Sequence, residues 1–216
     1  MKIDLACRKT NGLTLLELIA IITILVVLIG LLLPALSTGK GSKRSPCVNH
    51  LKCLGLAARI FATDNEGKFP WQVSTNANGS REYVKVPDTA FRHFLAMSNE
   101  LSTPRFLHCP EDMERTEADN WFISNQSISY FLGLDAKESV PQVLLAGDRN
   151  LMTNGVPVGS CLHVLTTNRK VGWTAQMHNN AGNVLFGDGH VDALSNGRLQ
   201  ELSRSSGEAT NRLLIP

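Results

Sequence analysis

The residues whose types could support catalysis or metal binding gather near the C-terminal end of the chain. His178, Asp188 and His190 could form a hydrolytic or metal site, and Asp188 with Asp192 could supply oxygen ligands to Ca²⁺. Their spacing matches no known ligand geometry by itself, and Asp188 followed by Gly189 is typical of a tight turn. A structural turn is therefore the favoured interpretation, while the catalytic and metal alternatives stay open.

Asp148 lies in a second polar segment, Gly147-Asp148-Arg149-Asn150, directly after an apolar stretch. We expect Asp148 to pair with Arg149 or to cap a turn rather than to act as a general base. The sequence contains no Gly-x-Ser-x-Gly elbow, no Walker loop and no Gly-x-Gly-x-x-Gly fingerprint. These patterns favour a protein that is not an enzyme, with no catalytic residue, no cofactor and no resident metal.

Composition narrows the function classes further. The 216 residues include 21 Lys and Arg against 19 Asp and Glu, a formal net charge of +2. This near balance argues against a nucleic-acid partner held by a basic surface. Hydrophobic residues make up 43% of the chain, which excludes wholesale disorder.

Residues 13–33 form an almost wholly apolar run in which Glu17 is the one charged residue, and Pro34 follows it. As a helix the run would extend about 31 Å at ~1.5 Å per residue, close to the ~30 Å hydrocarbon core of a bilayer. We therefore expect a transmembrane helix over residues 13–36. The alternative is a cleaved secretory signal on a soluble domain, with a weak cleavage site at residues 34–37.

Glu17 is unusual because a carboxylate near a bilayer interior is costly without a partner. Cleavage after Gly12 would create a new amino terminus at Leu13, one helical turn before Glu17. The two opposite charges would then lie close together, and the helix dipole favours an anion in the first turn. The alternative is that Glu17 lies shallow enough to reach lipid headgroups.

The string Lys9-Thr10-Asn11-Gly12, followed by Leu13-Thr14-Leu15-Leu16-Glu17, resembles the leader and start of type IV pilins and type II secretion pseudopilins. The resemblance implies that a prepilin peptidase cuts after Gly12 and that Leu13 is N-methylated. It also implies that Glu17 pairs with the N-terminus of a neighbouring subunit during assembly and that Pro34 forms a kink. Leu13 departs from the phenylalanine that is more common in the family.

The expected fold class is α+β and pilin-like. A long N-terminal transmembrane helix, broken or frayed near residues 38–46, precedes a helix packed on a small, mainly antiparallel sheet. The expected domains are a leader at 1–12, the transmembrane helix at 13–36, a Gly/Ser/Pro linker at 37–46 and an exported globular head at 47–216.

Within the head, apolar spacing predicts a helix over residues 47–61 with a buried stripe of Leu51, Leu54, Ala58 and Phe61. Further helices are expected at 89–101 and 198–203. Short strands are expected at 105–109, 128–132, 143–146 and 171–174. Residues 184–186 and 190–194 flank Gly187-Asp188-Gly189 and predict a hairpin.

The head carries a second resemblance. Cys47-Val48-Asn49-His50-Leu51-Lys52, His108-Cys109-Pro110, and a histidine followed after nine residues by Asp-Gly resemble pilin-like proteins typical of planctomycetes and verrucomicrobia. The family motif falls on His178, Asp188 and Gly189. This resemblance names a family and implies no established reaction.

Four cysteines remain once the leader, which contains Cys7, is removed. The resemblance places them outside the cytoplasm, where disulfides persist. Cys47 and Cys53 point in different directions on a helix and should not pair. We favour a Cys47–Cys109 disulfide, with buried free thiols as the alternative. Zinc is disfavoured because no Cys-x2-Cys pair exists, although histidines beside Cys109 and Cys161 leave it open.

Together these observations predict the precursor of a pilus-like or type II secretion pseudopilus subunit. Its expected partners are prepilin peptidase, other pilin or pseudopilin subunits and the inner membrane. Its N-terminus is expected in the cytoplasm and its head in the periplasm, or outside the cell in a filament. The alternative is a membrane-tethered exported enzyme or binding protein that does not polymerise.

Overall fold

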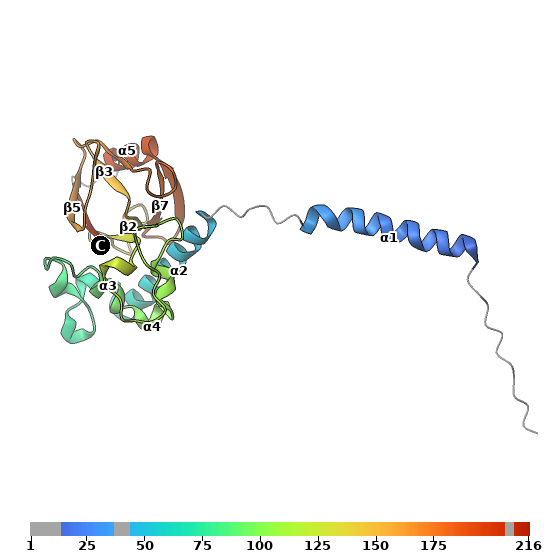
Figure 1. The fold of residues 1–216 in the computed structure, drawn as a ribbon. Helices are drawn as coiled ribbons and strands as arrows, with labels where there is room; N and C mark the ends of the chain where they lie inside the picture. Colours follow the sequence, from blue (N-terminus) through green and yellow to red (C-terminus); the bar gives the residue numbers. More distant parts are fainter. Residues whose placement is uncertain (1–13, 37–43, 206–209) are drawn as a thin grey trace, which may run out of the picture. The chain divides into compact units, whose positions relative to one another are not determined.

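The computed structural model describes residues 14–36, 44–205 and 210–216 of the chain (Figure 1). The chain divides into two compact units, Met1–Gly41 and Ser42–Pro216, which are described separately. The predicted leader at 1–12, the cleavage residues Gly12 and Leu13, and linker residues 37–43 lie outside the described residues.

The described part of the first unit is the helix α1 (Leu15–Leu36), which begins with a reciprocal cap. The Thr14 N–H donates to Oε2 of Glu17 at 3.2 Å, and the Glu17 N–H donates to Oγ1 of Thr14 at 3.3 Å. This capping box satisfies two N–H groups that would otherwise lack partners at the helix start.

The structure corrects the prediction of a membrane-spanning helix. Among the described residues, no helix is both long enough and apolar enough to cross a membrane, so the prediction over residues 13–36 is wrong. Pro34 lies in the last turn of α1, which stays helical to Leu36.

The second unit is the head, and its first helix is α2 (Arg44–Asp64). The predicted stripe of Leu51, Leu54, Ala58 and Phe61 is buried. The helix begins three residues before the predicted start, and Pro46 is tolerated because a first-turn residue needs no N–H partner. It ends where the Gly67 N–H donates to the Ala62 carbonyl at 2.8 Å, with Gly67 at φ +75°.

Short helical segments connect α2 to the sheet. Two of the predictions for this region are wrong. The helix expected over 89–101 is two helices, α3 (Phe91–Leu95) and α4 (Ser98–Leu101). The strand expected over 105–109 is wrong, because η4 (Pro104–Leu107) is a 3₁₀ turn opened by proline. The other 3₁₀ segments are η1 (Pro70–Gln72), η2 (Thr75–Ala77), η3 (Arg81–Tyr83) and η5 (Asn125–Ser127).

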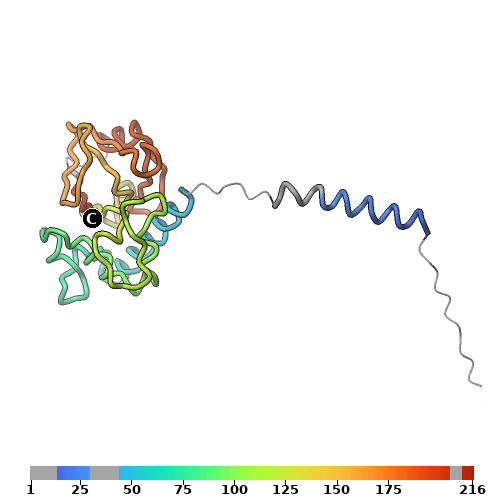
Figure 2. The backbone as a smooth tube through the Cα atoms, viewed as in Figure 1, coloured from blue at the N-terminus to red at the C-terminus, as the bar shows by residue number. Residues whose placement is uncertain are grey.

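A six-stranded sheet forms the centre of the head, in the order β5-β9-β1-β2-β7-β8, and every neighbouring pair is antiparallel. The α+β class and the antiparallel sheet are therefore confirmed. The strands are β1 (Tyr130–Gly133), β2 (Leu144–Asp148), β5 (Cys161–Thr166), β7 (Ala181–Phe186), β8 (Val191–Ser195) and β9 (Thr210–Ile215). The C-terminal strand lies between β5 and β1, which places the chain end within the head (Figure 2).

A smaller sheet, in the order β4-β3-β6, lies beside the last helix, α5 (Asn196–Ser205). Its strands are β3 (Leu151–Thr153), β4 (Val156–Pro157) and β6 (Val171–Trp173). The Trp173 N–H donates to Oδ1 of Asn196 at 2.5 Å, which joins β6 to the start of α5. The predicted strand near 171–174 and the helix near 198–203 correspond to β6 and α5.

Two apolar clusters form the core of the head. In the first cluster α2 packs against β7 and β2, so closely that a Cβ added at Gly55 would lie 2.8 Å from the Leu185 side chain. In the second, Gly182 of β7 lies against the Trp173 ring, 2.6 Å from where a Cβ would stand. β7 therefore packs against both clusters and positions the residues at its two ends.

Candidate functional site

The family-motif residues lie at opposite ends of β7, because residues 181–186 form the strand between them. His178 precedes the strand, and Asp188 and Gly189 follow it in the turn to β8. The six residues of β7 extend about 20 Å at ~3.4 Å per residue, so His178 and Asp188 do not share a site. The spacing of nine residues follows from one strand and its two turns.

At the far end of β7, Asp188 organises the hairpin turn. Its Oδ1 accepts the His190 N–H at 3.0 Å and lies 2.6 Å from Nδ1 of His190. The hydrogen bond from the His190 backbone holds the pKa of Asp188 below its ordinary value. Gly189 adopts φ +90°, a conformation that disfavours any residue with a Cβ. These contacts account for Asp188 and Gly189 as turn residues.

At the near end of β7, His178 occupies an unusual backbone segment. His178, Asn179 and Asn180 have φ of 50°, 51° and 60°, three consecutive left-handed residues that are not glycine. Such conformations are strained for a residue with a side chain and need support from the surrounding structure. The buried Asn150 supplies it, because its Nδ2 donates to the carbonyls of Thr174 at 3.0 Å and Met177 at 3.1 Å.

The His178 imidazole lies inside the head, with 2% of its side chain exposed. Its Nε2 lies 3.4 Å from Sγ of Cys109 and 3.4 Å from Oδ2 of Asp148. Burial is the largest cause that lowers the pKa of His178, and the Arg44 charge lowers it further. The imidazole is therefore held toward its neutral form.

Cys109 is joined to Cys47 in a disulfide, the pairing favoured from the sequence. Cys47 lies in the first turns of α2 and Cys109 follows η4, and neither residue is exposed. The disulfide therefore anchors the start of the helix to the segment 62 residues along the chain. The His178 ring covers the Cys109 side of this disulfide.

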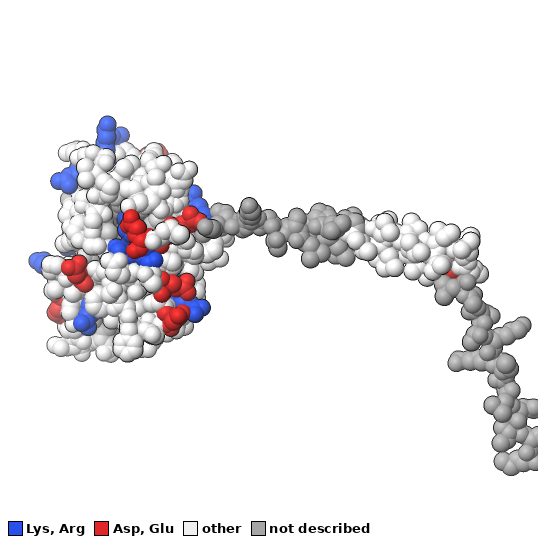
Figure 3. All heavy atoms as spheres, viewed as in Figure 1, with Lys and Arg blue, Asp and Glu red and all other residues white. Residues whose placement is uncertain are grey.

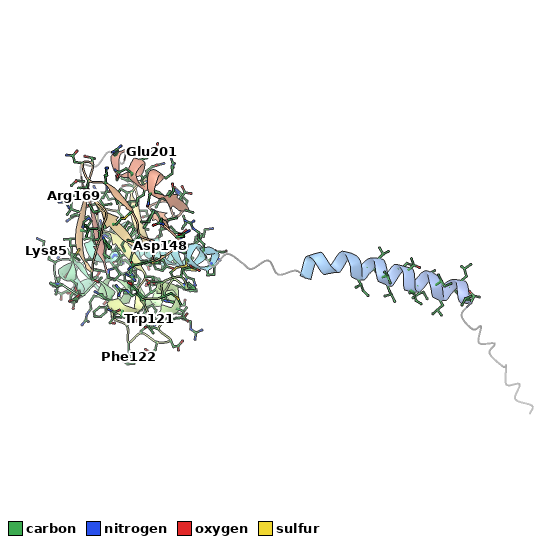
Figure 4. All side chains as sticks on the ribbon, turned by 45° about the horizontal axis from the view of Figure 1, so that its top comes forward. Lys85, Trp121, Phe122, Asp148, Arg169 and Glu201 are labelled. Atoms are coloured by element: carbon green, nitrogen blue, oxygen red, sulfur yellow. A yellow bond between two sulfur atoms is a disulfide. The ribbon has the colours of Figure 1, made fainter. Side chains whose placement is uncertain are left out.

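Asp148, labelled in Figure 4, ends β2. Its side chain is fully buried, with Oδ2 3.4 Å from Nε2 of His178. Its Oδ2 accepts the Asn183 backbone N–H at 2.6 Å and the Asn183 Nδ2 at 2.9 Å, while Oδ1 makes no hydrogen bond with the described residues. Burial raises the pKa of Asp148 to about 7, although both Asn183 hydrogen bonds oppose the shift. A carboxylate in these surroundings is costly in its charged form.

The expected pairing of Asp148 with Arg149 is wrong. Arg149 instead binds Asp112 through two hydrogen bonds of 2.7 Å and reaches Oε2 of Glu114 at 2.8 Å. Neighbouring residues at a strand end project to opposite sides, which separates the two side chains. The charge that faces Asp148 comes from Arg44 at the start of α2, whose Nε donates to Oδ1 of Asn183 at 3.0 Å.

The cluster differs from a nucleophilic triad. In a triad the base contacts the nucleophile through one ring nitrogen and the orienting carboxylate through the other. Here Cys109 and Asp148 both face Nε2 of His178, and the Cys109 sulfur is already bonded to Cys47. The arrangement therefore offers a buried imidazole, a buried carboxyl group and two sulfurs rather than an activated nucleophile.

No family model, no curated protein and no solved structure matches this chain. The description of the site therefore depends on its own geometry. Sequence reasoning missed Arg44, Asn150 and Asn183, which position the buried cluster, and Asp112, which binds Arg149. The only sequence signal for this site was that polar residues, Asp148 and Asn150, follow a buried strand. The contacts themselves carry no sequence signal, because they come from segments far apart in the chain.

Proposed function

We propose that the chain is the precursor of a pilus-like or pseudopilus-like filament subunit that assembles through α1. The supporting observation is that every described side chain from residue 14 to residue 29 is exposed. Twelve of these are large and apolar, with 47–79% of each exposed. Glu17 is the one charged residue between positions 14 and 29, and Figure 3 shows this part of α1 as a white surface with red near its start. A helix with this surface is stabilised by packing against other apolar helices.

The single charge on this surface supports the same proposal. Glu17 already lies against the helix start, since its Oε2 accepts both the N–H and the Oγ1–H of Thr14 at 3.2 Å. Cleavage after Gly12 would leave an amine one residue before Thr14. A carboxylate has about four acceptor sites, so Glu17 can cap its own helix and also bind the ammonium group of a neighbouring subunit. This contact would set the register between subunits.

A feature of the head supports the proposal that it is exported from the cytoplasm. Its buried Cys47–Cys109 disulfide is the kind of bond that persists in oxidising compartments and is rare in the cytosol. Removing the leader would also remove three basic residues and one acidic residue, which leaves equal numbers of each in the mature chain. A net charge near zero does not oppose association between copies.

The processing step is tested by mass spectrometry of the native protein. The expected chain begins at N-methyl-Leu13, which would identify prepilin peptidase as the processing enzyme. A chain that begins near Ser37, or an uncut chain that begins at Met1, would contradict the proposal.

The assembly step is tested by Glu17→Ala in the native host. We expect cleavage to continue and filament incorporation to fall at least tenfold, because the carboxylate partner of the ammonium group is lost. Glu66→Ala, an exposed acidic residue of the head, is the matched control and should assemble normally. Unchanged processing and assembly of Glu17→Ala would contradict the proposed mechanism, in which Glu17 sets the register between subunits.

A further inference from the structure

Three groups with metal-binding atoms meet at the buried end of β7, and a fourth lies beside one of them. Sγ of Cys47, Sγ of Cys109 and a ring nitrogen of His178 all lie within 4.8 Å of one another. Oδ2 of Asp148 lies 3.4 Å from Nε2 of His178. The four residues come from α2, the segment after η4, the turn before β7 and the end of β2, so no short sequence motif links them.

Two of the separations match the edges of one coordination tetrahedron. With Zn–S near ~2.3 Å and Zn–N or Zn–O near ~2.05 Å, tetrahedral geometry sets S···N at about 3.6 Å and N···O at about 3.3 Å. Sγ of Cys109 lies 3.4 Å from Nε2 of His178, and this nitrogen lies 3.4 Å from Oδ2 of Asp148. The two sulfurs would need to separate to about 3.8 Å, which requires the disulfide bond to be broken.

The surroundings of Asp148 point to a cation as well. Its Oδ1 is buried and makes no hydrogen bond with any described residue, and its side chain is 0% exposed. A buried carboxyl oxygen without a partner destabilises the fold. Asn183 holds the other oxygen with two hydrogen bonds, the kind of contact that orients a metal-binding carboxylate.

We propose that reduction of the Cys47–Cys109 disulfide converts this cluster into a Zn²⁺ site formed by Cys47 Sγ, Cys109 Sγ, His178 Nε2 and the Asp148 carboxylate. A dithiol is the reductant: the protein S–S bond breaks, each protein sulfur gains a proton, and the dithiol is oxidised to a cyclic disulfide. Zinc binding then forms two Zn–S bonds and releases both thiol protons to water. The start of α2 would thus be cross-linked by the disulfide when oxidised and by the metal when reduced.

The test uses the full chain in mild detergent with Cys53→Ser and Cys161→Ser. These changes remove the two free cysteines of the described head, one of which lies two residues from His163. The chain is reduced, freed of reductant without oxygen and titrated with Co²⁺, then with Zn²⁺. We expect one Co²⁺ per reduced chain, with thiolate-to-cobalt absorption that Zn²⁺ abolishes, and no such absorption from the oxidised chain. Equal absorption from both forms would overturn the proposal.

Variants then identify the other two ligands. His178→Ala and Asp148→Asn should each weaken Zn²⁺ binding by the reduced chain more than about tenfold. His190→Ala and Asp188→Asn, at the opposite end of β7, are matched controls and should bind Zn²⁺ as the unchanged chain does. Wild-type affinity in His178→Ala would overturn the assignment.

Folding is followed by near-ultraviolet circular dichroism in the same samples. Where reduction or a substitution diminishes this signal, Zn²⁺ should restore it in the parent chain and in the two control variants. Failure of Zn²⁺ to restore the parent signal would overturn the proposal, since the four groups must be held together to bind one ion.

Discussion

β7 carries the two halves of the His-x9-Asp-Gly motif at opposite ends, and the two ends meet different surroundings. The His178 side chain is 2% exposed, and its Nε2 faces both Asp148 and the Cys109 sulfur. Asp188 is 41% exposed and binds only its close neighbour His190 through its side chain among the described residues. One end is a buried cluster of ionisable groups beside a disulfide, and the other is a solvated turn. Residues that share a motif therefore need not share a site.

The largest expected effect comes from the disulfide at the buried end. Replacing both Cys47 and Cys109 by Ser should lower the free energy of unfolding by about 4 kcal/mol at 25 °C, because the bond closes a loop with a sequence separation of 62 residues. Denaturant unfolding followed by tryptophan fluorescence measures the change. Replacing the free Cys53 and Cys161 by Ser is the control, with an expected change within about 0.5 kcal/mol. Equal losses in the two double variants would contradict the role of the disulfide.

The next largest effect is a pH dependence at the same end. Burial raises the pKa of Asp148 from 3.8 to about 7, so between these values the folded chain holds a proton that the unfolded chain has released. The free energy of unfolding of the oxidised chain should therefore fall by a few kcal/mol as pH rises through this window. Asp148→Asn should remove most of the fall, as measured by unfolding at about pH 4.5 and about pH 7.5 with a chelator present.

Asp188→Asn is the matched control for this pH dependence. A hydrogen bond from the His190 backbone lowers the pKa of Asp188, so its contribution to stability is lost only as pH falls below the ordinary range. The free energy of unfolding of this variant should still fall between about pH 4.5 and about pH 7.5. If this fall in the free energy of unfolding remained in Asp148→Asn but disappeared in Asp188→Asn, the pH dependence would come from the exposed end of β7 and not from the buried end.

A smaller effect is expected at the exposed end. Asp188→Ala should lower the free energy of unfolding by about 1 kcal/mol, because it removes the acceptor of the His190 N–H in the turn. Combined with His178→Ala, the two losses should add within about 0.5 kcal/mol, as expected for separate sites. His178→Ala combined with Asp148→Asn should not add, because these side chains are 3.4 Å apart. Strong coupling between His178 and Asp188 would show that the two ends act as one site.

The smallest effect tests the left-handed turn before β7. Asn179 has φ 51° and an exposed side chain, so Asn179→Gly should leave stability unchanged or raise it by up to about 0.5 kcal/mol. Asn179→Ala should lower stability by about 1 kcal/mol, because alanine disfavours this conformation. Thermal unfolding of the two variants side by side measures the difference. A loss in Asn179→Gly as large as in Asn179→Ala would mean that the asparagine side chain, rather than the backbone, supports the turn.

The sequence predicted those elements of the fold that are set by residues close together in the chain. The stripe in α2 repeats with the helical period, and the Asp-Gly turn between β7 and β8 has its own residue preference. The β5 and β9 strands were missed, although they pair over six residues. β5 has an exposed edge with little alternation, and β9 follows a polar segment at the chain end, so neither carries a strong local pattern. The strand expected at 105–109 failed because Pro104 opens a 3₁₀ turn instead.

The amino-acid sequence by itself determined the position of α2, the β7–β8 turn and the apolar, helical character of the α1 segment, because each depends on residues close together in the chain. It also suggested the Cys47–Cys109 pairing. Only the tertiary structure decided that Asp148 faces His178 rather than Arg149. That contact joins the end of β2 to the turn before β7, and the pairing of these two strands is set by burial and backbone hydrogen bonds along the whole head, so no local spacing could encode it.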